Sequence, residues 1–161
     1  MPPEITVQVE DEPGRGDLDA HLALLRRAAE ATLRRARADD AFLSVTLLPD
    51  ASIAAMNAAH LGHAGPTDVI SFRLEGPDGR LEGDVYVGHE VAARTAAEER
   101  IPAAEELVRL TVHGTLHVLG HDHVPGPERT AGEMWRLQEE LVREVMREAS
   151  AAPARPEAGT Q

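Results

Sequence analysis

Hydrophobic and polar positions along this chain follow two patterns, one typical of strands and one typical of helices. Residues 4–10 (EITVQVE) alternate apolar and polar side chains, which predicts a half-buried strand. Residues 42–48 predict a second strand. The runs 67–74 and 83–88, separated by the turn-rich EGPDGRLE, predict a β-hairpin. Together these segments predict one sheet of about four strands.

Helical spacing covers most of the remaining chain. Between Asp17 and Ala38, leucine and alanine recur at helical spacing and arginine fills much of the rest, so we expect an amphipathic helix with a basic face. A second helix is expected to start at Pro49-Asp50, with Asp50 as its cap, and to run through Ala59. Further helices are expected at 89–99, from Pro102 to Leu119, and at about 128–148.

This order of elements predicts an α/β or α+β domain, with one sheet flanked by helices. A chain of 161 residues is the size of one ordinary domain, and 42% hydrophobic residues supply a core. We therefore expect a single domain over residues 1–148. The Ala/Pro/Gly-rich residues 149–161 are typical of a disordered tail.

Composition narrows the chemistry that is available. The chain has no cysteine, so a transition metal must be held by histidine and carboxylate side chains. The N-terminus lacks the pattern of a signal peptide and no stretch is long and apolar enough to span a membrane, so a cytoplasmic protein without membrane contact is expected. The net charge of −12 argues against loose attraction to polyanions, so the arginine-rich face of residues 17–38 is interpreted as solvated.

Four histidines gather in the segment HGTLHVLGHDH, residues 113–123. His113 and His117 are four residues apart on a predicted helix, which places both imidazoles on one face. On a continued helix, His121 would lie about 12 Å along the axis from His113, too far for one ion. The helix must therefore end, and Gly120 is suited to end it. His123 then has the longer connection for turning back, which favours it as the third ligand.

Three neutral imidazoles around one zinc ion per chain leave a fourth position for water, which is the arrangement of hydrolytic sites. We therefore predict a zinc-bound water as the catalytic group. His121 is an alternative fourth ligand, which would close the site. Asp122 can either accept a hydrogen bond from a ligand imidazole or cap the turn.

The same segment closely resembles the HGxLHLxGYDH signature of the YbeY endoribonuclease family of bacterial ribosomal-RNA maturation factors. MNAAHLGHAGPTDVISF resembles that family's LNxxYRxxxxPTDVLSF segment, GDVYV resembles its GDI strand, and EMWRLQEELV resembles its Met-x-x-x-Gln-Glu-Glu helix. The resemblance covers roughly residues 40–145 in the same order.

The resemblance implies an α/β fold with the site in a cleft beside the sheet, and zinc ligands at His113, His117 and His123. It also implies a single-strand-specific endoribonuclease. The implied partners are ribosomal RNA and the small ribosomal subunit, in 3′-end maturation and ribosome quality control.

Two departures from the family pattern stand out. His121 replaces a tyrosine, and Leu61, preceded by His60, replaces the arginine of the Tyr-Arg pair. An arginine facing the metal would bind phosphate and offset the charge of the transition state. His60, His63 and Arg73 are candidates to replace it, against the alternative that they are solvated loop residues.

Alternative interpretations of Asp84 and of the function stay open. Asp84 is a candidate proton acceptor or partner of the site, or a residue with only a turn or strand-start role. A metallopeptidase is disfavoured because Gly114 stands where HExxH proteases carry their glutamate. A non-catalytic ribosome-assembly factor stabilised by zinc is the alternative outside enzymes.

Overall fold

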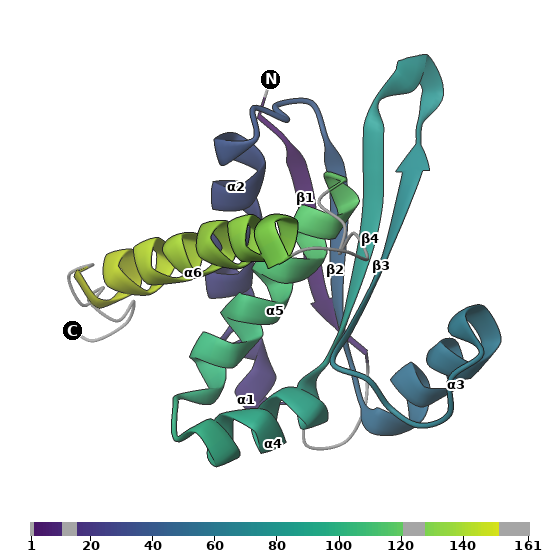
Figure 1. The fold of residues 1–161 in the computed structure, drawn as a ribbon, viewed down its shortest axis with the longest axis vertical. Coiled ribbons are helices and arrows are strands. Elements are labelled where there is room, and N and C mark those ends of the chain that lie inside the picture. Colours follow the sequence, from purple (N-terminus) through teal and green to yellow (C-terminus); the bar gives the residue numbers. More distant parts are fainter. Residues whose placement is uncertain (1, 11–15, 121–127, 152–161) are drawn as a thin grey trace, which may run out of the picture.

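The computed structural model describes residues 2–10, 16–120 and 128–151 (Figure 1). Its sheet has four strands in the spatial order β1-β2-β4-β3. The strands β1, β2 and β4 are parallel, and β3 pairs antiparallel with β4 at one edge. The predicted sheet and its hairpin are therefore confirmed. The strands are β1 (Glu4–Val9), β2 (Phe42–Leu48), β3 (Val69–Glu75) and β4 (Leu81–Gly88).

Helices surround this sheet, and the α/β or α+β class is confirmed. The longest, α6, crosses α5 and α2, while α3 lies apart from them at the other side of the sheet (Figure 1). A short 3-10 turn, Pro77–Gly79, joins β3 to β4. The helices are α1 (Gly16–Asp19), α2 (Leu22–Arg35), α3 (Asp50–Leu61), α4 (His89–Glu99), α5 (Ala103–Val118) and α6 (Glu128–Ala151).

Alternation along the strands separates the sheet into two faces. Val85 and Val87 point into the main core with α2, α5 and α6, and we call this side the helix-covered face. Phe72 and Tyr86 point the other way, where they pack near Ile53 of α3, and we call this side the α3 face. A functional side chain on a strand can therefore reach only one of two separate environments.

Glycine allows α5 to lie close against the sheet. A Cβ atom at Gly114 would lie 2.5 Å from Val85 Cγ1, and one at Gly83 would lie 2.3 Å from Val118 Cγ1. Neither position has room for a larger residue unless the facing valine or the backbone moves. These two contacts fix the height and register of α5 over β4.

Several predicted details of the helices were wrong. The helix expected from Asp17 to Ala38 is two helices, with a turn at His21, and it ends at Arg35 because Arg37 adopts a left-handed conformation with φ of 59°. Asp50 does not cap α3, since its carboxylate accepts hydrogen bonds from Arg94 instead.

The last helix, α6, reaches Ala151, so residues 149–151 are helical rather than part of a tail. Residues 152–161 lie outside the described part of the chain. Within the described residues, no helix has the length and apolar character needed to cross a membrane.

Candidate metal centre

Two half-buried histidines on α5 form the centre of the candidate site. The helix begins after Pro102 and carries Glu105 and Glu106 in its first turn, where negative charge is favourable to the helix dipole. At Gly114 it lies close against Val85 of the sheet. Since His113 and His117 are one turn apart, their rings stack edge to face with centroids 4.5 Å apart. Their Nε2 atoms lie 3.0 Å from each other.

This separation fits a pair of ligands to one ion. Two nitrogens on a tetrahedral zinc ion, each about 2.0–2.1 Å from the metal, are about 3.3 Å apart. The Nε2 atoms of His113 and His117 are within a few tenths of an ångström of that value, and they converge on the same region. Neutral imidazole nitrogens are among the donors that zinc prefers, so the pair fits a zinc ion.

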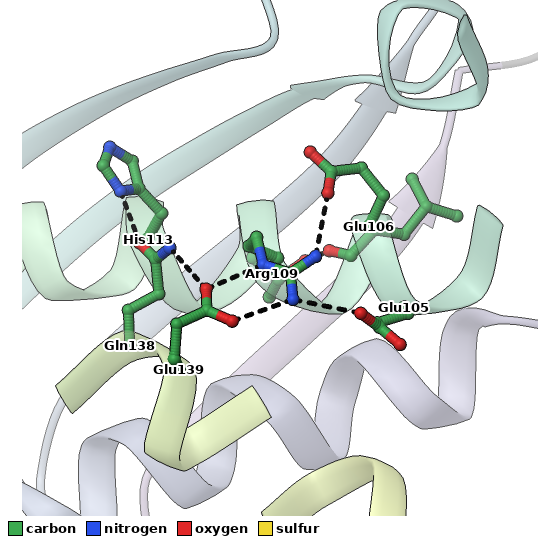
Figure 2. A network of polar contacts seen from close by, with 8 residues as sticks. Glu105, Glu106, Arg109, His113, Gln138 and Glu139 are labelled. Carbon is green, nitrogen blue, oxygen red and sulfur yellow. Dashed lines mark hydrogen bonds and ion pairs between the residues drawn. The ribbon is translucent and has the colours of Figure 1, made fainter. Parts of the chain in front are cut away.

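His113 is also held from its other side. Its Nδ1 atom lies 2.7 Å from Oε1 of Gln138, a buried residue of α6 (Figure 2). Nε2 of Gln138 donates in turn to Oε2 of Glu139, at 3.2 Å. The candidate ligand on α5 is thereby connected to α6, which follows the histidine segment in the chain.

Arg109, one turn before His113, binds three carboxylates (Figure 2). It donates to both oxygens of Glu139 at 2.8 and 2.9 Å, and to Glu105 and Glu106 at 3.0 Å each. The hydrogen bond with Glu139 raises the pKa of Arg109 and lowers that of Glu139. Burial raises the pKa of Glu106, because the bond from Arg109 only partly offsets the lost hydration.

The polar cluster borders a cavity of about 360 Å³. Gln138, Glu139 and Arg109 line this cavity together with Trp135, which is 60% exposed. The cluster therefore faces a hollow at the surface, and its member Gln138 contacts His113.

The third predicted ligand, His123, lies outside the described residues, as do His121 and Asp122. Among the residues that are described, no group of three metal-binding side chains occurs. The predicted end of the helix is confirmed: Gly120 has φ of +99°, and its N–H donates to the carbonyl of His117. The chain thus leaves α5 immediately after the histidine pair, as a returning ligand requires.

The structure does not bring Asp84 to the histidine pair. Its neighbours Gly83 and Val85 lie under α5, so Asp84 points to the α3 face. There it accepts a hydrogen bond of 2.7 Å from Ser44. Asp84 thus lies within β4 rather than at its start.

The candidate replacements for the family arginine lie in different places. His60, in the last turn of α3, contacts the ring of Phe72 on the α3 face, and His63 follows that helix in an exposed segment. Arg73 lies elsewhere: a Cβ atom at Gly120 would be 3.1 Å from its Nη1 atom. Of these three candidates, Arg73 is the one whose charged group reaches the end of α5 that carries the histidines.

Sequence reasoning missed Gln138, Glu139 and Arg109 as parts of this site. A signal was available for two of them, because Gln138 and Glu139 belong to the EMWRLQEELV segment that resembles a family motif. Arg109 carried no such signal, since an arginine in an amphipathic helix usually indicates a solvated position.

A comparison with protein families shows to which family this chain belongs. The family model described as "Endoribonuclease YbeY" matches residues 7–146, which include both histidines of α5 and the Gln138–Glu139 pair. The chain belongs to the endoribonuclease YbeY family. Of the segments that resembled this family, all fall inside the matched range.

Relatives of known name agree with this assignment. A YbeY endoribonuclease of Persephonella marina is 35% identical over 134 residues, covering 81% of this chain and 87% of the relative. One from an Anaeromyxobacter species is 41% identical over 144 residues, covering 86% of this chain and 71% of the relative. The solution structure of TM1509 from Thermotoga maritima matches this fold with a TM-score of 0.61 at 25% identity, covering 98% of this chain and 99% of that one.

Proposed function

We propose that this protein is a zinc-dependent endoribonuclease that cuts single-stranded RNA. Its membership of the endoribonuclease YbeY family supports an enzyme that hydrolyses RNA during ribosomal-RNA processing. The proposed setting is 3′-end maturation of small-subunit ribosomal RNA and ribosome quality control, with the small subunit as partner.

The observation that carries the proposal is the convergence of the two Nε2 atoms on α5, 3.0 Å apart. We propose His113, His117 and His123 as the ligands of one zinc ion per chain, with Asp122 as a hydrogen-bond partner of a ligand. The left-handed conformation of Gly120 supports the assignment of His123 as the third ligand, because it ends α5 three residues before His123.

In such an open site, zinc supplies Lewis acidity, which acidifies a water molecule and polarises a phosphoryl oxygen. The protein's part is to hold neutral imidazoles in position. Arg73 is proposed to contact substrate phosphate, since its guanidinium lies at the histidine-bearing end of α5. Asp84 is given no part in the chemistry, because it points to the α3 face.

Metal content and RNA cleavage, measured on the same preparations of wild type and His117→Ala, test the proposal. Wild type is expected to carry about one zinc per chain and to cut single-stranded RNA, and the variant to lose both, because two ligands hold zinc poorly. His21→Ala is the matched control: His21 stands before α2 and makes no side-chain cap hydrogen bond. It should retain zinc and activity.

Other results would point elsewhere. Wild-type protein without zinc would remove the metal site from the proposal. Zinc without RNA cleavage, together with ribosome binding that survives His117→Ala, would favour the non-catalytic assembly factor. Peptide cleavage that a chelator abolishes would favour the metallopeptidase.

A further inference from the structure

Hydrogen bonds run without interruption from Arg109 on α5, through α6, to His113 (Figure 2). Arg109 donates to Glu139 at 2.8 and 2.9 Å, and the amide of Gln138 contacts Glu139 at 3.2 Å. The same amide contacts Nδ1 of His113 at 2.7 Å. Gln138 is only 8% exposed, so water competes little for these contacts.

The chemistry of the groups gives this chain of bonds one direction. A guanidinium can only donate hydrogen bonds, and an ionised carboxylate can only accept them. Glu139 is held ionised by Arg109, which lowers the pKa of its carboxyl group. The NH₂ group of Gln138 must therefore face Glu139, and its carbonyl oxygen must face His113. The amide cannot be flipped without placing its carbonyl against the carboxylate.

The direction of the bonds assigns the proton on His113. A carbonyl oxygen accepts hydrogen bonds, so Nδ1 of a neutral His113 must carry the hydrogen. The lone pair of this imidazole is then on Nε2, which is the atom that lies 3.0 Å from Nε2 of His117. A histidine binds a metal through such an unprotonated nitrogen.

We propose that Gln138 is a positioning residue, oriented by the Arg109–Glu139 ion pair, that fixes His113 in the Nδ1–H tautomer with its Nε2 lone pair directed toward His117. The purpose assigned to that lone pair, binding of zinc, rests on the proposed function. The tautomer itself does not rest on it and can be measured in metal-free protein.

A rival explanation is that the cluster only fastens α6 to α5. Fastening requires bonds between the helices, but it does not require a particular orientation of the Gln138 amide or a particular tautomer of His113. Variants that preserve packing while removing or restoring the acceptor for Nδ1 separate the two explanations. Gln138→Met removes the acceptor at similar volume, and Gln138→Glu restores an oxygen that accepts from Nδ1.

The decisive measurement is the tautomer of His113, from long-range ¹⁵N–¹H correlation spectra of metal-free protein at about pH 8, above the reference imidazole pKa of about 6.5. Wild type and Gln138→Glu are expected to show Nδ1 protonated. Gln138→Met is expected to lose that preference. Gln8→Met is the matched control, because Gln8 donates to Thr46, which pairs in register with Tyr86 of the α3 face.

Zinc affinity, measured by competition with a chromophoric chelator, gives the second readout. Loss of such an outer partner typically weakens metal binding roughly 10- to 100-fold, so Gln138→Met should fall in that range and Gln138→Glu should recover. If Gln138→Met does not fold, Glu139→Gln serves instead, because a neutral amide at 139 no longer dictates the orientation of Gln138.

An Nε2–H tautomer in the wild type would overturn the proposal. So would an Nδ1–H tautomer that persists in Gln138→Met, even with weakened zinc binding, since the residue would then act through packing alone. Wild-type protein that binds no zinc but shows the expected tautomers would remove the proposed function and leave this inference standing.

Discussion

The two faces of the sheet differ in both packing and chemistry. On the helix-covered face, the described core consists of aliphatic side chains, alanine and methionine, and glycines bring α5 directly onto β4. On the α3 face, Phe72 packs edge to face against both Tyr86 and His60, and a single short helix covers only part of the strands. The histidine pair lies on α5, on the side that is packed more closely. Chemistry that depends on tenths of an ångström is thus placed where side chains have the least freedom to move.

The largest expected effect is that of breaking the close contact between α5 and the sheet. Gly114→Val should lower the free energy of unfolding by about 3 kcal/mol, because its side chain would overlap Val85 and force α5 outward. Urea denaturation measures this change. Ala55→Val, at an exposed position of α3, is the control and should cost less than about 1 kcal/mol. Wild-type stability of Gly114→Val would mean that the covered face is looser than described.

A smaller loss of stability is expected from a substitution in the polar cluster on the same side of the sheet. Glu139→Gln should lower stability at pH 7 by about 1.5–3 kcal/mol, because it replaces a charge-assisted, two-pronged bond with Arg109. Since the folded state lowers the pKa of Glu139, the contribution is present above the ordinary carboxyl pKa and is lost as the pH falls through the lowered value. The gap between wild type and variant should therefore narrow on acidification. A constant gap would contradict this origin.

Glu106→Gln should not lower the free energy of unfolding, although Glu106, like Glu139, accepts a hydrogen bond from Arg109. Burial raises the pKa of Glu106, so the folded state disfavours its charged form relative to water. The variant should be as stable as wild type at pH 7 or up to about 1 kcal/mol more stable. Its advantage should grow as the pH rises from the ordinary carboxyl pKa through the raised one. Thermal unfolding at several pH values tests this, and a destabilised variant at pH 7 would contradict it.

The smallest effect is expected on the α3 face. Asp84→Asn should leave the rate of RNA cleavage within about twofold of wild type, whereas loss of a general acid or base typically costs roughly 10²- to 10⁴-fold. Single-turnover cleavage of RNA by the zinc-loaded protein measures the rate. A loss of a hundredfold or more would show that the two faces do not divide the chemistry as described.

Local patterns predicted the framework of the fold well. The strand at residues 42–48 has the predicted bounds, since its buried positions follow the sequence pattern. The end of α5 was also predicted, because glycine accepts the left-handed conformation that stops a helix. The turn at His21 and the role of Asp50 were missed. The first interrupts a pattern that stays amphipathic on both sides, and the second depends on Arg94, which is 44 residues away in sequence.

The candidate site was predictable only in part, because local patterns do not encode contacts between segments that are distant in sequence. His113 and His117 share one helix, so their spacing alone places them together. Gln138 contacts His113 across 25 residues and two helices, and no local pattern encodes that packing. Asp84 shows the converse limit: alternation predicts that it faces away from its neighbours, but not which face α5 covers.

The placement of aromatic side chains has a practical consequence for spectroscopic measurements of unfolding. The tryptophan, Trp135, is already 60% exposed in the folded state, and the tyrosine and both phenylalanines belong to the α3 side of the sheet. Melting of the aliphatic core would therefore change intrinsic fluorescence very little, and ellipticity of the backbone would report it far better. Trp135 lies one turn from Gln138, so its emission should respond instead to events in the part of α6 that contacts His113.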